Sequence, residues 1–242
     1  MPVHVVSWLR RMRWKRTHDI QFRNLSPRVR GALLGVLLLG IGLMGCQLFF
    51  RLQYIPVRLA GYPVSAFQYM TDQNVQGNLV VKFKWAQYAI AAFGPPAVER
   101  PQLRVAFDGR FDTCYPQEVL DMYFDFEIGD APLTMRCRSA KSPPVDGSRI
   151  LEYKNPNLVL IDRADQHCVN VMWQHRDRWT LLYQDAVAQL WGRRDIYDNA
   201  QQADYLPPED RVIGDAQQQG VVPWPALPRR KAAPIQLAGV QP

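Results

Sequence analysis

The sequence has little histidine, and this restricts the chemistry that the chain can carry. Only four of its 242 residues are histidine, and two of them, His4 and His18, lie within the first 30 residues. Histidine is the common general base near neutral pH, so His167 and His175 are the candidates for that role in the rest of the chain. The sequence also lacks a G-x-S-x-G motif, so it does not indicate a Ser-His-Asp hydrolase.

Patterns for metal and phosphate binding are missing as well. The four cysteines include no C-x-x-C pair, no H-E-x-x-H motif occurs, and no glycine-rich phosphate loop follows residue 51. Those motifs are typical of zinc and nucleotide sites, so the sequence predicts no metal and no other cofactor. Cys114 and Cys137 lie near the ends of two neighbouring predicted strands. An exported compartment favours their pairing as a disulfide, although the sequence leaves the connectivity open.

Excess positive charge is confined to the N-terminal arm. The chain has a net charge of +7, and the first 30 residues, with eight Lys or Arg against one Asp, carry all of it. The folded part is neutral overall and has no basic run between Leu52 and Asp210. Nucleic-acid binding is therefore not predicted, and the arm is interpreted as a determinant of membrane topology.

One apolar segment is long enough to cross a membrane. Residues 31–50 contain no charged side chain, and Arg30 and Arg51 bracket them. Twenty helical residues span about 30 Å, the thickness of the hydrocarbon core, so a transmembrane or signal-anchor helix is expected over residues 31–51. The positive-inside rule then predicts an inner-membrane protein with a cytoplasmic N-terminus and a periplasmic or extracellular main domain.

A second type of anchor competes for the same segment. Leu43-Met44-Gly45-Cys46 resembles the lipobox of bacterial lipoproteins, and this resemblance implies cleavage before Cys46 and lipidation of its thiol. Met44 departs from the small or β-branched residue usual at that position, and the basic arm is long for a signal peptide. Apolar residues continue past Cys46, which favours an uncleaved helix. Both alternatives export the same domain.

Composition and periodicity divide the remaining chain. Residues 1–30 are the basic cytoplasmic arm, and residues 52–77 are a connector punctuated by proline and glycine. Period-2 alternation predicts strands in residues 78–197. The predicted strands cover residues 79–85, 103–107, 119–128, 133–138, 149–154, 158–161 and 168–173, of which 119–128 has the strongest pattern.

The end of the chain shows two further patterns. Apolar residues recur at helical spacing from Trp179 to Trp191, which predicts a helix that closes the domain. Residues 198–242 are rich in Pro and Gln and poor in apolar side chains, which is typical of a disordered tail. Trp224 within this tail is a candidate contact for a partner. The predicted fold class is therefore α+β: a membrane helix, a small and mainly antiparallel β domain, a C-terminal helix and a disordered tail.

Two function classes remain open. The first is a non-enzymatic binding or assembly module, anchored in the membrane of a bacterial cell envelope and working with a protein partner. The alternative is an envelope hydrolase, since paired carboxylates about 5–10 Å apart hydrolyse glycosides. Its candidate residues are Asp121, Asp125 and Glu127 on strand 119–128, with His167 or His175. The solvated face of an antiparallel sheet produces the same pattern, which favours the first class.

Overall fold

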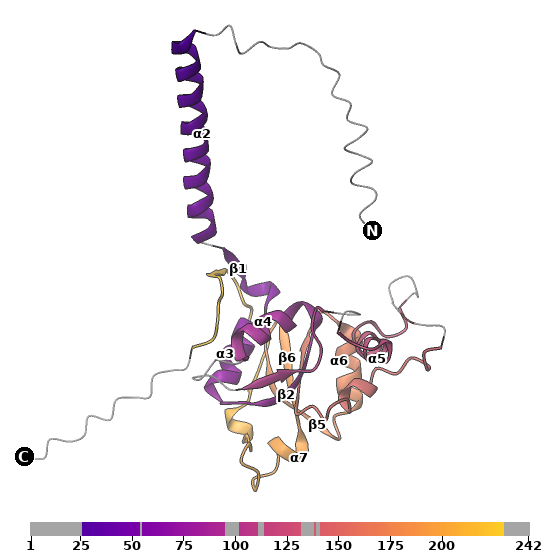
Figure 1. Cartoon of the computed structure of the whole chain (residues 1–242). Helices are drawn as coiled ribbons and strands as arrows, with labels where there is room; N and C mark the ends of the chain where they lie inside the picture. The colour runs from indigo at the N-terminus through magenta and orange to yellow at the C-terminus, as the bar shows by residue number, and fades with distance from the viewer. Residues whose placement is uncertain are drawn as a thin grey trace, which may run out of the picture. The chain divides into compact units, whose positions relative to one another are not determined.

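The computed structural model describes residues 26–53, 55–94, 102–110, 114–131, 138 and 141–229. The chain divides into two units, residues 1–54 and 55–242, which are described separately. In the first unit, helix α2 (Pro27–Gln53) confirms the predicted apolar helix and extends it at both ends (Figure 1). Among the described residues it is the one helix long and apolar enough to cross a membrane.

The second unit is built on a six-stranded mixed sheet with the order β3-β2-β4-β6-β5-β7. The strands are β2 (Gly77–Val81), β3 (Leu103–Val105), β4 (Leu158–Asp162), β5 (Trp179–Gln184), β6 (Ala188–Arg193) and β7 (Val212–Ile213). Strand β2 pairs in parallel with both β3 and β4, and β5 pairs in parallel with β7. The central strand β6 is antiparallel to both β4 and β5.

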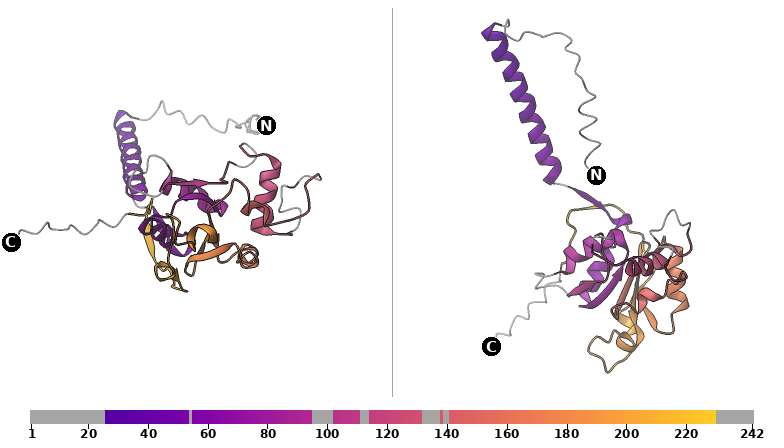
Figure 2. Two further views of the ribbon diagram at one scale, coloured as in Figure 1. Left: turned by 90° about the horizontal axis from the view of Figure 1, so that it is seen from below. Right: turned by 45° about the vertical axis from the view of Figure 1, so that its right-hand side comes forward.

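Helices cover both faces of this sheet, so the domain has three layers (Figures 1 and 2). The helices are α3 (Val64–Asp72), α4 (Phe83–Phe93), α5 (Gln117–Ile128), α6 (Gln166–Gln174) and the short α7 (Arg194–Tyr197). Leu79 and Val81 of β2 pack with α3 and α4, whereas Val80 packs with α5 and α6. This alternation follows from the two-residue period of a strand, which buries both faces when helices cover both.

Several shorter elements complete the second unit. The 3₁₀ turns among the described residues are η2 (Leu59–Gly61), η5 (Arg149–Leu151) and η6 (Pro208–Asp210). Strands β1 (Pro56–Arg58) and β8 (Val221–Pro223) pair with each other as a separate antiparallel ribbon. We call these two strands the β1–β8 ribbon.

The strongest predicted strand is a helix, and this overturns the expectation of a mainly antiparallel domain. Residues 119–128 lie within α5, where Val119, Tyr123 and Phe126 are buried at helical spacing. The alternation of apolar and acidic residues indicated a half-exposed strand only if the acids faced water. Asp121 and Asp125 are instead buried, so the polar positions did not mark a solvent face.

The predicted C-terminal helix is also wrong. Residues 179–191 form most of the β5–β6 hairpin, in which Asp185 accepts hydrogen bonds from the amides of Val187 and Ala188 at 2.6 and 2.8 Å. Strand β6 is buried on both faces, so its burial does not alternate between core and solvent. Periodicity alone does not distinguish such a doubly buried strand from a buried helix segment.

Other predicted strands have mixed outcomes. The predicted strands at 103–107 and 158–161 correspond to β3 and β4, and residues 79–81 of the predicted strand 79–85 lie in β2. Its second half is wrong, because residues 83–85 form the first turn of α4. Residues 168–173 lie instead in α6, and residues 149–151 form η5. The predicted strand at 133–138 falls outside the described residues except for Arg138.

The predicted disordered tail begins much too early. Between residues 198 and 229 the chain forms η6, joins the main sheet as β7 and pairs with β1 as β8. Polar contacts hold this stretch, since the guanidinium of Arg211 donates to the carbonyl oxygen of Leu206 and to Asp198 at 2.7 and 2.6 Å. Residues 230–242 lie outside the described residues.

Candidate functional site

The first candidate site lies at the carboxyl ends of β2 and β4. The chain leaves β2 toward α4 on one face and leaves β4 toward α6 on the other. In open α/β sheets, a crevice at such a switch point is the usual place for a ligand. Lys82 directly follows β2, Asp162 is the last residue of β4, and Asp165 lies three residues beyond it, so all three occupy this position.

Ion pairs fill the switch point. The ammonium group of Lys82 lies 3.0 Å from Asp162 and also contacts Asp165, while Lys84 lies 2.9 Å from Asp162. Burial acts to lower the pKa of Lys82, but the hydrogen bonds to Asp165 and Asp162 outweigh it and raise the pKa. Burial likewise acts to raise the pKa of Asp162, yet hydrogen bonds from Lys84, the Ala164 amide and Lys82 hold it below its usual value. Lys82 and Asp162 therefore stay charged and paired at neutral pH.

Glu127 closes the inner side of the same crevice. Its carboxylate accepts a hydrogen bond of 3.4 Å from the amide of Phe83, the first residue of α4. A helix N-terminus attracts anions, so Glu127 takes the place that a bound phosphate would occupy in a nucleotide-binding fold. Burial raises the pKa of Glu127. The cavity that remains among these residues measures about 10 Å³, enough for about one water molecule.

Two of the predicted catalytic carboxylates hold the loop that follows α5. Asp121 and Asp125 lie one helical turn apart and face the loop at residues 138–149. Gln117 and Ser142 donate to Asp121, and Arg138, Arg149 and the Asp146 amide donate to Asp125. The Asp125 side chain is completely buried, so these bonds fasten the loop to the helix rather than face a substrate.

The predicted histidines do not complete a hydrolytic pair. The Nε2 atom of His167 lies 3.0 Å from the backbone carbonyl of Asp125, not from its carboxylate. His175 lies at the end of α6, with its Nδ1 atom 3.4 Å from the guanidinium of Arg178. The hydrolase alternative assumed that a strand places Asp121, Asp125 and Glu127 on one face. These residues lie on helix α5 instead, so that arrangement is not present.

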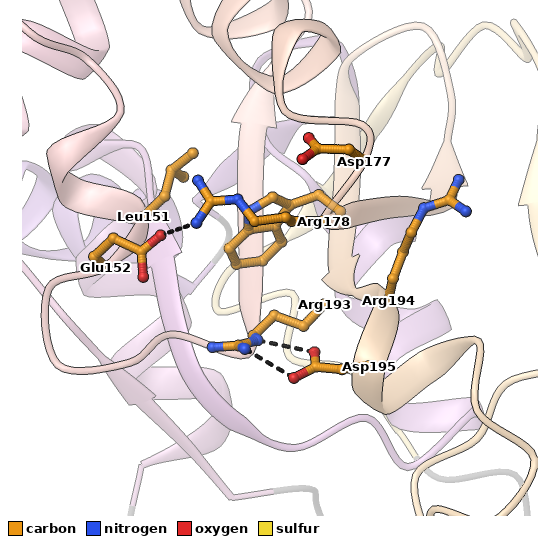
Figure 3. Close-up of a pocket in the computed structure, with 8 residues that line it drawn as sticks. Leu151, Glu152, Asp177, Arg178, Arg193, Arg194 and Asp195 are labelled. Atoms are coloured by element: carbon orange, nitrogen blue, oxygen red, sulfur yellow. Dashed lines mark hydrogen bonds and ion pairs between the residues drawn. The ribbon is translucent and has the colours of Figure 1, made fainter.

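The second candidate site is an open pocket of about 300 Å³ at the opposite end of the sheet (Figure 3). Its residues come from the end of η5, the turn before β5 and its first residue, the end of β6 and the start of α7. They are Leu151, Glu152, Asp177, Arg178, Trp179, Arg193, Arg194 and Asp195. We call it the arginine pocket. Trp179 is buried at its base, while Arg178, Arg194 and Asp195 are exposed at its rim.

Exposed ion pairs hold the guanidinium groups of the arginine pocket. Arg193 makes two hydrogen bonds to Asp195, at 3.0 and 2.8 Å, and one to Asn155. Arg178 pairs with Glu152, and Arg194 lies 3.5 Å from Asp198. Because these pairs are exposed to water, each contributes about 0–1 kcal/mol. A carboxylate from another molecule is therefore able to replace the internal partner at little cost, which suits recognition of acidic groups.

Sequence reasoning missed the arginine pocket for a topological reason. Its three arginines lie in two sequence segments, and Glu152 lies in a third. Strand pairing of Trp179 with Arg193 brings the segments together. No local motif carries this information, although the Arg193-Arg194 pair after an apolar run is a visible signal.

The remaining predicted site residues are distributed over both units. Cys46 is exposed on α2. Cys137 lies outside the described residues, so the disulfide with Cys114 stays a prediction. Trp224 follows β8 and is 52% exposed. In the described residues no cluster of His, Cys, Asp and Glu is arranged to hold a metal ion.

Comparisons with known proteins add no relative, because no family model, curated protein or solved structure matches this chain.

Proposed function

We propose that this chain is a non-enzymatic binding or assembly module of the bacterial cell envelope, anchored in the inner membrane by α2. The arm before α2 stays in the cytoplasm, and the domain from Ile55 onward lies on the periplasmic or extracellular side. The eight cations before α2, against Arg51 and Arg58 soon after it, support this orientation. The long apolar surface of α2 supports membrane anchoring.

The observation that carries the proposal is the occupied switch point. Lys82, paired with Asp162 and Asp165, fills the crevice in which an α/β domain of this topology would hold a substrate. Glu127 takes the anion position at the start of α4. The chain's own side chains thus occupy the place where a substrate would bind. This supports a binding or assembly role for the α/β domain rather than catalysis.

The arginine pocket is the surface that we assign to a protein partner. Arginine and buried aromatic residues are enriched in the central contacts of protein interfaces, and Arg178, Arg193 and Trp179 supply both here. The guanidinium groups favour carboxylates, with which they make paired hydrogen bonds. The proposed partner segment is therefore acidic, with side chains that replace Glu152 and Asp195.

Site-specific photocrosslinking in intact cells tests this assignment. A photoreactive amino acid at position 178 is expected to form a discrete adduct with one envelope protein. Position 176 is the matched control, because Arg176 is exposed two residues away and does not line the pocket. A substitution at the pocket, Arg193→Ala, is expected to remove the adduct at 178.

The outcomes separate the alternatives. An adduct at 178 that is absent at 176 and lost with R193A supports the assignment. Equal adducts at both positions, or an adduct that R193A leaves unchanged, overturn it. If the purified protein in addition hydrolyses peptidoglycan or another envelope glycan, and Glu127→Gln abolishes that activity, the non-enzymatic proposal is wrong.

A further inference from the structure

The β1–β8 ribbon ends in an exposed apolar pair. Its register pairs Pro56 with Pro223 and Val57 with Val222, which places Ile55 opposite Trp224 at the next position. The amide of Trp224 donates to the carbonyl of Ile55 at 2.8 Å, so the ladder continues to this pair. Ile55 is 45% and Trp224 52% exposed, whereas Val57, two residues along β1, is buried.

Covalent geometry places this pair next to the membrane anchor. Helix α2 ends at Gln53, and Ile55 follows two residues later. Consecutive Cα atoms are about 3.8 Å apart, so Ile55 lies within about 8 Å of the end of the helix in any orientation of the domain. Trp224 is hydrogen-bonded to Ile55 and is therefore also held near the end of the helix. Tryptophan is enriched where a protein meets the bilayer interface, because its ring is apolar and its N–H is polar.

The charge around the ribbon fits the same position. Residues 51–71 and 216–229 contain Arg51, Arg58 and Arg229 and no acidic residue. The next acid, Asp72, accepts a hydrogen bond from the Gln68 amide, which also donates to the backbone carbonyl of Arg229. Arg58 and Arg229 are exposed, and neither makes an ion pair with a described residue. A groove of about 560 Å³, lined by Val64 and residues 222–229, runs beside Trp224 and ends at Arg229. Cations beside an apolar surface are typical of segments that bind anionic lipids.

We propose that the Ile55–Trp224 end of the ribbon inserts into the headgroup layer of the bilayer that α2 crosses, while Arg58 and Arg229 contact anionic lipid phosphates. The inference rests on the proposed anchoring by α2. A protein partner at Trp224, as the sequence suggested, is the competing occupant. The bilayer is favoured because two residues separate the ribbon from the anchor, so lipid is the surface that this pair meets first.

Fluorine NMR of the full chain in lipid nanodiscs tests the docking. The protein is labelled with 5-fluorotryptophan, and the variants Trp224→Phe and Trp173→Phe assign two resonances. Trp173 is the matched control, since it is 47% exposed but lies on α6, far along the chain from the anchor. A nitroxide attached to the lipid headgroup is expected to broaden the Trp224 resonance strongly and to leave the Trp173 resonance sharp.

Each outcome decides a separate point. Failure of the chain to enter the discs refutes the anchoring by α2. Stable insertion with equal broadening of the Trp224 and Trp173 resonances refutes the docking alone and assigns Trp224 to a protein partner. Discs with zwitterionic lipid only are expected to give weaker broadening than discs with anionic lipid. The double variant R58Q/R229Q is expected to remove that difference. If the Trp224 resonance of the natural protein broadens equally in both kinds of disc, the phosphate contacts are refuted.

Discussion

The backbone amide of Trp224 donates a hydrogen bond to the carbonyl oxygen of Ile55 and so ties the turn after β8 to the first residue of the second unit. Two further contacts act in the same region. The hydroxyl of Tyr88 donates to the carbonyl of Ala226, and Gln218 donates to the buried carboxylate of Asp185. Residues 217–229 are therefore part of the folded domain, although their composition is that of a tail.

Truncation tests this integration. Deletion of residues 217–242 removes β8, Gln218 and Ala226, and we expect it to lower the free energy of unfolding by about 2–4 kcal/mol. Thermal unfolding of the full chain in detergent, followed by tryptophan fluorescence, measures the change. Deletion of residues 230–242 is the control, because it keeps every contact named above. Equal stability of the two truncated proteins would show that the ribbon contributes nothing to the domain.

Two phenylalanines distinguish the helix α5 from the strand that the sequence predicted. Phe126 is 3% exposed and lies in the core, whereas Phe124 is half-buried at its edge. We expect Phe126→Ala to destabilise the domain by about 3–5 kcal/mol through lost burial and a residual cavity, and Phe124→Ala to cost clearly less. Chemical denaturation of both variants measures the difference. In a strand the two rings would share one face, and equal losses would favour that arrangement.

The sequence predicted an element correctly where its pattern of apolar and polar residues matched the burial of those residues in the fold. Helix α2 was predicted because lipid requires a long uncharged run, and the strands at β2, β3 and β4 were predicted from period-2 patterning. The same rules failed at α5 and β6. Pairing with Arg138 and Arg149 allows Asp125 to be buried, so its charge did not mark the surface. Strand β6 is covered on both sides, so it lost the alternation that identifies a strand.

The candidate sites could be predicted only in part. Asp125 and Glu127 were singled out by their charge, yet their roles depend on Arg138, Arg149 and the start of α4. The arginine pocket depends on the pairing of β5 with β6, which a helix prediction excluded. Those are long-range contacts, and a single sequence contains no local signal for them.

Asp125 makes the stability of the domain depend on pH. Burial acts to raise its pKa, but hydrogen bonds from Arg138, the Asp146 amide and Arg149 hold the pKa below the usual value. An unfolded aspartate has a pKa of about 3.9, so the stabilisation by Asp125 is complete well above pH 4 and decreases as pH falls through the lower folded pKa. We expect Asp125→Asn to cost about 3–5 kcal/mol at pH 7, since it leaves buried cations unpaired.

Thermal unfolding of the natural protein and D125N between pH 3 and pH 7 measures this dependence. The difference between them is expected to shrink toward the acid end. Asp195→Asn is the control, because Asp195 forms an exposed ion pair with Arg193 that contributes about 0–1 kcal/mol. A D125N penalty that stays constant over this pH range would assign the loss to packing rather than to the carboxylate charge.

The orientation in the membrane is testable by fusion. A reporter enzyme that is active only outside the cytoplasm, fused after Pro242, is expected to be active, because the positive-inside rule predicts that the cationic arm keeps the N-terminus inside. Neutral residues in place of Arg10, Arg11, Arg13, Lys15 and Arg16 are expected to reduce that activity. The activity is measured per amount of full-length fusion. An inactive reporter on the natural sequence would place the domain in the cytoplasm.

The mode of anchoring depends on Cys46, which lies inside α2 rather than at its end. Seven residues of the helix follow it, including Leu48, Phe49 and Phe50, and these complete the apolar stretch. Cleavage before Cys46 would remove most of that stretch, so an uncleaved helix makes full use of it. We expect mature protein of full mass, and Cys46→Ala should leave the protein in the membrane fraction. Intact mass spectrometry and labelling with a radioactive fatty acid measure both. Label on Cys46, together with loss of residues 1–45, would establish the lipoprotein alternative instead.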